Sequence, residues 1–443
     1  MGQMAAEQNN ELIPSARRLV TSLRDMGYDF SAAVADLVDN SVVADATLVA
    51  IDVEFDGDDS WVRIADNGCG MATAQLKESM RYGAERDYDA DDLGKFGLGL
   101  KTASLSQCQR LSVASRTNPK RAEITAFCWD LAHIQKTNRW ELIPLDRQGL
   151  GPAIREPLKD TCGTVVLWQK LDRILGFKHP YGEAARKCLS AMCRELEEHL
   201  AMVFHRFLGG EVSGKRFKIL LNGNEVKPWD PYARNEPKTN SLTTVKLPVE
   251  HNGVKGEIVL APFVLPHEKQ FSSPDAHTRM SGPRRWNHQQ GFYIYRANRM
   301  IQSGGWCNLR TLDEHTKLAR VALRFSPKLD DAFKINVSKM RVQLPPQLHD
   351  QIERALGPVI KIAQETYRKG AKQPAITHQA GTTSGGDVAA PPADNANSST
   401  PSRPSTAKLW TFEEIEERIQ EVARSDEKPV IARVFERLRG RLK

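Results

Sequence analysis

Apolar and polar residues follow two different periods along the chain, and these periods predict its strands and helices. Residues 50–55 alternate as a half-buried strand does, and residues 61–64 are the expected hairpin partner across a polar turn. Residues 163–168 form a short apolar run that is typical of a buried strand. Between residues 183 and 207 the apolar side chains recur at helical spacing, which predicts a long helix. An α/β layer is therefore expected up to about residue 208.

A second region with its own strands is expected from about residue 213 to residue 372. It opens with an apolar strand at residues 217–221, and the Asn-Gly pair at residues 222–223 is typical of a hairpin turn. Residues 291–296 predict another strand, and a helix is expected after the Pro-Pro pair at residues 345–346. A polar loop is expected between these strands, at residues 267–290. Its basic residues are Lys269, Arg279, Arg284 and Arg285.

The composition changes near residue 373. Residues 373–407 are rich in Ala, Pro, Ser, Thr, Gly and Asn, which predicts a disordered linker. Beyond it, residues 411–414 have the form of a capping box and lead into an apolar stripe at helical spacing. Pro429 then begins a second short helix that is rich in arginine. This tethered helical hairpin is expected to dock onto a partner protein.

Composition and charge narrow the class of protein. A chain of 443 residues with 40% hydrophobic and 26% charged residues is typical of a soluble protein with two or three domains. No apolar run is long enough to cross a bilayer and the N-terminus is polar, so neither a membrane partner nor a signal peptide is expected. The seven dispersed cysteines indicate reduced thiols and a cytoplasmic location. The net charge of +7 permits a nucleic-acid partner without requiring one.

The first of three polar motifs occupies residues 35–41 on a predicted helix. Asp36 and Asn40 are four residues apart, so both side chains project from one face of that helix. Such a pair can divide the work at a metal site, with the Asn40 oxygen ligating Mg²⁺ and Asp36 orienting or deprotonating a water molecule. An ordinary helix with a polar face explains the same spacing.

The second motif, residues 66–71, directly follows the strand at residues 61–64. Asp66 at the end of a strand can accept a hydrogen bond from an exocyclic amine, and Gly68 and Gly70 let the backbone approach a flat ring. A tight Asp-Asn-Gly turn explains this motif equally well.

The third motif, residues 94–104, has three glycines ahead of a run of small residues that begins a helix. Exposed backbone N–H groups and the helix dipole form an anion site for phosphates in such a segment. It is neither a P-loop nor a dinucleotide fingerprint, because Lys101 follows Gly99 after one residue and no strand immediately precedes it. A glycine-rich loop alone does not establish a phosphate site.

In this order and spacing, the three motifs resemble the Bergerat ATP-binding fold of the GHKL superfamily, which includes gyrase, the ninety-kilodalton heat-shock chaperone, histidine kinases and MutL. The resemblance covers roughly residues 17–208. It implies that Asn40 holds Mg²⁺, that Asp66 recognises the adenine amino group of ATP, and that residues 82–92 form a lid. The further nucleotide contacts that it implies are Gly68, Gly70, Met71, Gly94, Lys95, Phe96, Gly97, Leu98, Gly99, Lys101 and Thr164.

Two departures from the family pattern bear on hydrolysis. The position of the usual catalytic Glu is Asp36, whose side chain is one methylene shorter. That changes its reach by more than about 1 Å, which is costly where geometry is tight, so slow turnover is expected. The Asp that often follows the Asn by three residues is Val43 here.

Residues 333–342 resemble the transducer domain of MutL and MORC-like members, in which a lysine reaches back to the γ-phosphate. Lys339 matches that lysine, so a catalytic and phosphate-sensing role is implied for it beside Asp36. A solvated lysine at the end of a strand is the alternative. The chain as a whole resembles the bacterial MORC/MutL-like ATPases that occur beside restriction-modification and phage-defence genes.

These observations together predict an α+β protein with four parts. They are a Bergerat-fold α/β sandwich that binds ATP at residues 1–210, a β-α-β transducer domain at residues 211–372, a disordered linker at residues 373–408, and a C-terminal helical docking element at residues 409–443.

The expected function is that of an ATPase that works as a clamp. ATP and Mg²⁺ are the expected substrate and cofactor, two copies are expected to dimerise when ATP binds, and double-stranded DNA is the candidate client. Two alternatives stay open: an ATP-gated scaffold with little turnover, and a chaperone-like ATPase that acts on a protein. Under the clamp interpretation, the loop at residues 267–290 contacts DNA, although a solvated loop explains its charges as well.

Overall fold

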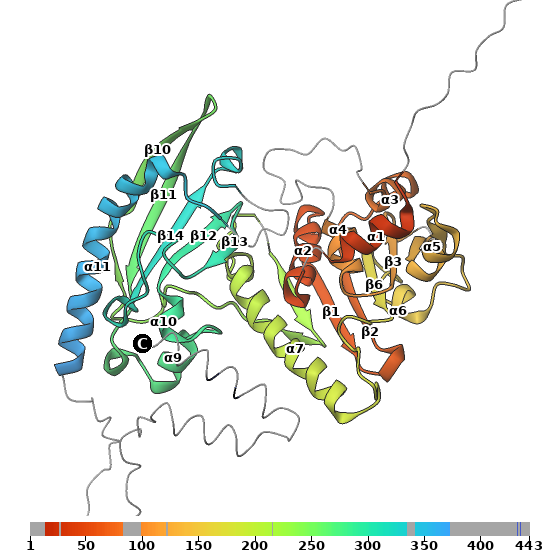
Figure 1. The fold of residues 1–443 in the computed structure, drawn as a ribbon, viewed down its shortest axis with the longest axis horizontal. Coiled ribbons are helices and arrows are strands. Elements are labelled where there is room, and N and C mark those ends of the chain that lie inside the picture. The colour runs from red at the N-terminus through yellow and green to blue at the C-terminus, as the bar shows by residue number, and fades with distance from the viewer. Residues whose placement is uncertain are drawn as a thin grey trace, which may run out of the picture. The chain divides into compact units, whose positions relative to one another are not determined.

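The computed structural model describes residues 14–25, 28–82, 99–120, 123–214, 216–334 and 342–372, and the isolated residues Ala432 and Phe435. This part of the chain contains two β-sheets, each with its own helices (Figure 1). Among the described helices, none combines the length and the apolarity needed to cross a membrane. The expected linker and C-terminal hairpin lie outside the described residues except for those two isolated positions, so both stay predictions.

The first sheet has eight strands in the order β5-β4-β3-β6-β2-β1-β7-β8. Its strands are β1 (Leu48–Glu54), β2 (Trp61–Asp66), β3 (Arg110–Arg116), β4 (Thr125–Asp130), β5 (Ile143–Pro144), β6 (Gly163–Gln169), β7 (Lys218–Leu221) and β8 (Asn224–Glu225). The predicted hairpin at residues 50–64 is confirmed, because β1 and β2 pair antiparallel with Ile51 opposite Ile64. The predicted strand at residues 163–168 is β6, which lies between β2 and β3.

Alternating side chains of this sheet fill two separate cores. Ile64, Val113 and Val166 belong to the larger core, which they share with the helices. Their neighbours Ala65 and Ala114 belong to a smaller core on the opposite face, because successive side chains of a strand point to opposite faces. The helices of this domain are α1 (Ala16–Arg24), α2 (Phe30–Val43), α3 (Thr73–Met80), α4 (Gly99–Leu105), α5 (Leu131–Thr137), α6 (Pro152–Arg155), α7 (Glu183–Val203) and α8 (His205–Leu208). The long helix predicted at residues 183–207 is therefore divided into two helices, α7 and α8.

Helix α2 is buried along most of its length, which is unusual for a helix that carries two aspartates. It begins where the side chain of Asp29 accepts a hydrogen bond of 2.7 Å from the backbone N–H of Ala32, an N-cap interaction. Small residues such as Ala33 and Ala35 let it pack closely, and it contacts both α4 and α7. Polar residues on α2 are therefore held in fixed positions by the packing around them.

The turn predicted at residues 222–223 forms, but its strands join a different sheet from the one expected. Asn222 and Gly223 both have positive φ angles, as a tight hairpin requires, and β7 pairs with β8. However, β7 also pairs parallel with β1, and Ile219 and Leu221 lie in the core of the first sheet. Alternation along a strand shows which side chains are buried but not which sheet receives the strand. The hairpin thus belongs to the first sheet, and the division of the chain at residue 211 stays a prediction.

The second sheet has the order β10-β11-β14-β12-β13, with β9 paired to β11. Its strands are β9 (Asn240–Ser241), β10 (Val245–His251), β11 (Val254–Val264), β12 (Gly291–Arg296), β13 (Arg299–Ser303) and β14 (Ala319–Phe325). Helix α11 (His349–Lys372) packs along this sheet (Figure 1) and contributes Ile352, Leu356 and Val359 to its core. The strand predicted at residues 291–296 and the helix predicted after residue 346 are thereby confirmed.

The segment expected as a polar loop between these strands contains two short helices, α9 (Pro274–Met280) and α10 (Arg285–Gln289). Ser273 caps α9 with a 3.1 Å hydrogen bond from Ala276, and Pro274 occupies its first position, so the local sequence accounts for the helix start. The remaining short elements are 3₁₀ turns, η1 (Gly57–Asp59), η2 (Glu268–Gln270), η3 (Glu314–Thr316), η4 (Pro327–Leu329) and η5 (Pro346–Leu348).

Candidate nucleotide site

Helix α2 places Asp36 and Asn40 one turn apart but in different surroundings. The Asp36 residue is only 4% exposed, whereas Asn40 is exposed. An exposed amide oxygen suits Mg²⁺, which takes few protein ligands and keeps phosphate and water oxygens around it. The exposure of Asn40 therefore fits the expected metal ligand, and the roles of Asn40 and Asp36 stay predictions.

Both oxygens of Asp36 have close polar neighbours. The hydroxyl of Tyr28 donates a hydrogen bond of 3.0 Å to Oδ2, and Nη2 of Arg299 lies 3.7 Å from Oδ1. Burial, with the charge of Asp36 as a further cause, raises the pKa of Tyr28, so the hydroxyl keeps its proton and acts as a donor. Gly99 lies beside the same carboxylate, since a Cβ atom there would stand 3.5 Å from Oδ2. The first and third motifs thus meet at Asp36.

Asp66 ends β2 and collects three donors. Its Oδ1 accepts hydrogen bonds from the backbone N–H of Gly68 at 2.9 Å and of Thr164 at 3.2 Å. Its Oδ2 accepts one of 3.1 Å from the hydroxyl of Ser41 on α2. Burial raises the pKa of Asp66, and these donors lower it only in part. The carboxylate is therefore fixed between α2, β2 and β6.

The glycines near Asp66 are required by close backbone contacts. A Cβ atom on Gly68 would lie 2.7 Å from the carbonyl oxygen of Ala44, and one on Gly70, whose φ is +67°, would lie 2.2 Å from that of Arg116. Only glycine fits such positions without displacing backbone. These contacts hold the second motif against its neighbours, and the lining of an adenine ring by Gly68 and Gly70 stays a prediction.

Hydroxyl groups connect the second motif with the start of β6. The backbone N–H of Met71 donates to Oγ of Ser115 at 2.7 Å, and Ser115 and Thr164 are joined by a hydroxyl contact of 3.0 Å. Ser115 also donates to the carbonyl of Gly163 at 2.9 Å. Thr164 is thus adjacent to Asp66 through its backbone and to Met71 through Ser115.

Lys101 has a position that its sequence context does not indicate. Its ammonium group donates to the carbonyls of Ser79 at 2.9 Å and Arg81 at 2.7 Å, at the end of α3. The side chain is buried, and this burial lowers the pKa of Lys101 to about 8. In this structure Lys101 therefore ties α4 to α3, and its contact with a phosphate stays a prediction. Gly94, Lys95, Phe96, Gly97, Leu98 and Lys339 lie outside the described residues.

Sequence reasoning missed four polar residues of this site. Ser41 donates to Asp66 and Ser115 contacts Thr164. Tyr28 and Arg299 contact Asp36. The sequence contained a signal for Ser41, because this residue follows Asn40 directly on the same predicted helix. Arg299 belongs to the second sheet, and no spacing in the sequence connects it with Asp36.

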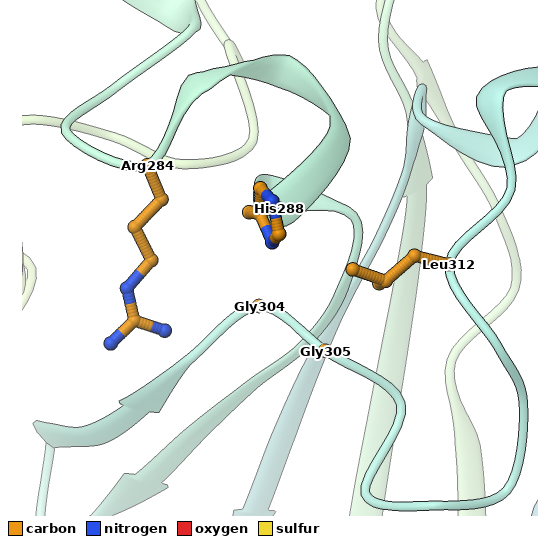
Figure 2. A pocket seen from close by; sticks show the side chains of 5 residues that line it. All are labelled: Arg284, His288, Gly304, Gly305 and Leu312. Atoms are coloured by element: carbon orange, nitrogen blue, oxygen red, sulfur yellow. The ribbon is translucent and has the colours of Figure 1, made fainter. Parts of the chain in front are cut away.

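A separate cavity of about 420 Å³ lies at the second sheet, away from the three motifs. Arg284 and His288 line it together with Gly304, Gly305 and Leu312 (Figure 2). Its charged groups are exposed, and Arg284 donates a 2.8 Å hydrogen bond to the carbonyl of Ser303. No described residue of the three motifs lines this cavity.

Comparisons with known proteins agree with the geometry around Asp36 and Asp66. Residues 28–164 match the family described as "Histidine kinase-, DNA gyrase B-, and HSP90-like ATPase". The chain is 38% identical over 102 residues to the DNA mismatch repair protein MutL of Erwinia tasmaniensis, a match that covers 22% of this chain and 16% of that protein. It is 37% identical over 92 residues to MutL of Haemophilus influenzae, covering 20% of this chain and 14% of that protein.

The matched segment is thus a small part of each relative. A solved structure, the crystal structure of the N-terminal domain of a DNA repair protein, aligns with 80% of this chain and 97% of its own, at 16% identity and a TM-score of 0.42. At that TM-score the alignment does not establish a common fold over the whole chain. The matched residues 28–164 include Asp36, Asn40, Asp66 and Thr164. Over residues 28–164 the chain therefore matches the GHKL ATPase domain of the histidine kinase-, DNA gyrase B- and HSP90-like family, in an α+β architecture of the Bergerat type, and a segment of the chain is similar to MutL.

Proposed function

We propose that this protein is a Mg²⁺-dependent ATPase that works as a nucleotide-gated, dimerising clamp on DNA, in a DNA-processing or defence system. The observation that carries the ATP site is the carboxylate of Asp66, held by Ser41, Gly68 and Thr164 with an orientation fixed from three elements. A carboxylate held in this way is preorganised to accept a hydrogen bond from the exocyclic amine of adenine.

The residues of α2 supply the other functions. Asn40, an exposed residue, would hold Mg²⁺ through its amide oxygen, and the metal, when bound, would neutralise charge on the phosphates. Asp36, turned inward, would orient the attacking water and accept its proton. Lys339 and the glycines of residues 94–99 complete the proposed phosphate site, by their resemblance to the family. Slow turnover is proposed because Asp36 is shorter than the usual Glu.

DNA is proposed as the client on two grounds. The relatives that match this chain over its ATPase region bear the name DNA mismatch repair protein. The segment at residues 267–290 also presents exposed cations, among them Arg284 at the rim of the cavity in Figure 2 and Arg285 at the start of α10. Cations on one surface attract the phosphate backbone of DNA independently of its sequence.

The clamp is tested by measuring ATP turnover and oligomeric state on the full chain. Double-stranded DNA is expected to stimulate turnover, and a non-hydrolysable ATP analogue is expected to convert monomers into dimers in light scattering. An equal rate of ATP turnover with and without DNA, together with dimers formed on nucleotide binding, would favour a chaperone-like ATPase. ATP binding without turnover would favour the ATP-gated scaffold, for which the shorter Asp36 is the supporting observation.

The DNA contact has its own test. Replacing Arg284 and Arg285 together by Gln should weaken DNA binding and reduce its salt slope by about 1 to 2. The matched control replaces Lys136 and Arg139, two exposed cations near α5, and removes the same charge elsewhere. Equal losses in the two variants would show that only net charge matters and would remove the assignment to residues 267–290.

A further inference from the structure

Arg299 comes from the second sheet, yet its guanidinium group lies against helix α2 of the ATPase domain. It is the first residue of β13, after the turn at Ala297 and Asn298. Its Nε donates a hydrogen bond of 2.9 Å to Asp39, and its Nη2 lies 3.7 Å from Asp36. One arginine therefore faces two carboxylates on successive turns of the same helix.

All three charged side chains are removed from water. The exposed fractions are 5% for Arg299, 0% for Asp39 and 4% for Asp36. Charges buried to this extent are stable only when their partners are correctly placed, and the planar guanidinium group fixes the relative directions of what it contacts. The ring centre of Phe204 lies 6.0 Å from the guanidinium carbon. The position of β13 is thus transmitted to α2 through the planar guanidinium group of Arg299.

Asp36 is consequently held from two directions. Tyr28, just before α2, donates to Oδ2, while Arg299 approaches Oδ1 from the second sheet. The shorter contact of Arg299, to Asp39, anchors it on α2, and its contact with Asp36 aligns that carboxylate from the side. A shift of the second sheet would remove the contact of Arg299 with Asp36 and change the direction of that carboxylate.

We propose that Arg299 is a positioning residue for Asp36. Through Arg299, the second sheet sets the orientation of the carboxylate that orients the attacking water and accepts its proton. This inference rests on the proposed ATPase function. If it holds, the second sheet controls the hydrolytic step through Asp36, independently of any contact that this sheet makes with the nucleotide. In this arrangement, ATP binding depends on Asn40 and Asp66, and turnover depends in addition on where β13 lies.

The structure offers a matched control in Arg206 of α8. Its Nη1 donates a 3.4 Å hydrogen bond to Asn298, in the turn before Arg299, and its guanidinium carbon lies 3.5 Å from the ring centre of Tyr295. Arg206 thus contacts the same hairpin of the second sheet and is similarly buried, but within the described part of the chain it does not contact Asp36. Arg206→Gln removes a buried cation that contacts this hairpin and leaves Arg299 and its two carboxylates in place.

The test compares Arg299→Gln, Arg299→Lys and Arg206→Gln in the full chain, with ATP turnover and ATP affinity measured separately. Arg299→Gln should lower kcat on the order of 100-fold, as misplacement of a reacting group does, while ATP affinity stays at the wild-type value. Arg299→Lys restores the charge without the fork and should recover part of the loss. Arg206→Gln should keep the wild-type kcat.

Three results would overturn the proposal: an unchanged kcat in Arg299→Gln, an increased kcat in it, or an equal loss in Arg206→Gln. Hydrogen exchange of the α2 amides provides a second readout that does not need turnover. If the wild-type chain fails to hydrolyse ATP, the proposed function fails, and the inference is then decided by exchange. Faster exchange of α2 in Arg299→Gln than in Arg206→Gln supports the coupling, and equal exchange contradicts it.

Discussion

The hydroxyl of Tyr28 donates a hydrogen bond of 3.0 Å to Oδ2 of Asp36, and both residues are buried. Tyr28 precedes the N-cap of α2, so the start of the helix and the carboxylate two turns later are tied together. A buried carboxylate oxygen needs a donor, and here it receives one whose proton is retained at all ordinary pH values. The pair therefore serves both the stability of α2 and the direction of Asp36.

Tyr28→Phe removes this donor and leaves the ring in place. We expect a loss of about 1–3 kcal/mol in the free energy of unfolding, because a buried carboxylate loses this hydrogen bond. We also expect a lower kcat with unchanged ATP affinity. Urea denaturation and turnover assays measure the two effects, and Tyr181→Phe, at a 64% exposed tyrosine, is the control. Equal stability of the two variants would contradict the assignment.

Nucleotide recognition by Asp66 should depend on pH in a definite direction. Burial raises the pKa of Asp66 above its usual value of about 3.9. Protonation removes the acceptor for the adenine amine, so affinity for ADP should fall as the pH decreases through this raised value.

ADP and inosine diphosphate carry the same phosphates, so the ratio of their affinities removes the effect of phosphate titration. Inosine lacks the exocyclic amine, so this ratio measures how strongly the protein recognises that amine. We expect this ratio to fall toward one as the pH decreases, and to be close to one at every pH in Asp66→Asn. A ratio independent of pH in the wild-type protein would show that Asp66 does not recognise the amine.

Two glycines with similar backbone angles should respond differently to alanine. Gly70 has φ +67° and a backbone carbonyl 2.2 Å from its absent Cβ, whereas Gly210 has φ +70° and nothing within 4 Å. Gly210→Ala should cost only the left-handed strain, roughly 1–2 kcal/mol. Gly70→Ala adds a collision with Arg116 and should also weaken ATP binding, because the second motif must shift. Thermal unfolding and nucleotide titration distinguish the pair, and equal costs would contradict the packing argument.

Lys101 should make stability depend on pH in the alkaline range. Its pKa is lowered to about 8 in the folded protein, whereas an unfolded lysine titrates near about 10.4. Between these values the unfolded chain binds more protons, so this group makes the folded state gain stability as the pH rises.

Replacing Lys101 by Met removes that gain. The unfolding free energy of the wild type minus that of Lys101→Met should therefore increase between about pH 7 and pH 10, by no more than about 3 kcal/mol. Urea denaturation at both ends of the range measures it, with the exposed Lys136→Met as control. A constant difference would show that Lys101 titrates as an ordinary lysine.

The sequence predicted those features that depend on neighbouring residues. Alternation located β1 and β2, helical spacing located α7, and the Asn-Gly pair located the turn between β7 and β8. The order of the three motifs predicted an ATPase domain of this family, which the match over residues 28–164 confirms. These features follow from local periodicity, turn chemistry and motif spacing.

Features that depend on tertiary pairing could not be predicted in this way. The hairpin at residues 218–225 joins the first sheet because β7 pairs parallel with β1, a partner about 170 residues away in the chain. The contact between Arg299 and Asp39 spans 260 residues. Glycines 68 and 70 were interpreted through a ligand, whereas the structure shows backbone contacts that require glycine at both positions.

The central claim, an ATP site built on Asp66 and Asn40, is tested most directly by calorimetric titration of ATP with Mg²⁺ into the full chain. The wild-type protein should bind one ATP per chain, Asp66→Asn should lose preference for adenine, and Asn40→Ala should bind equally well with and without Mg²⁺. Binding by the wild type that neither substitution alters would contradict the site, and an absence of binding by the wild type would contradict the proposed function itself.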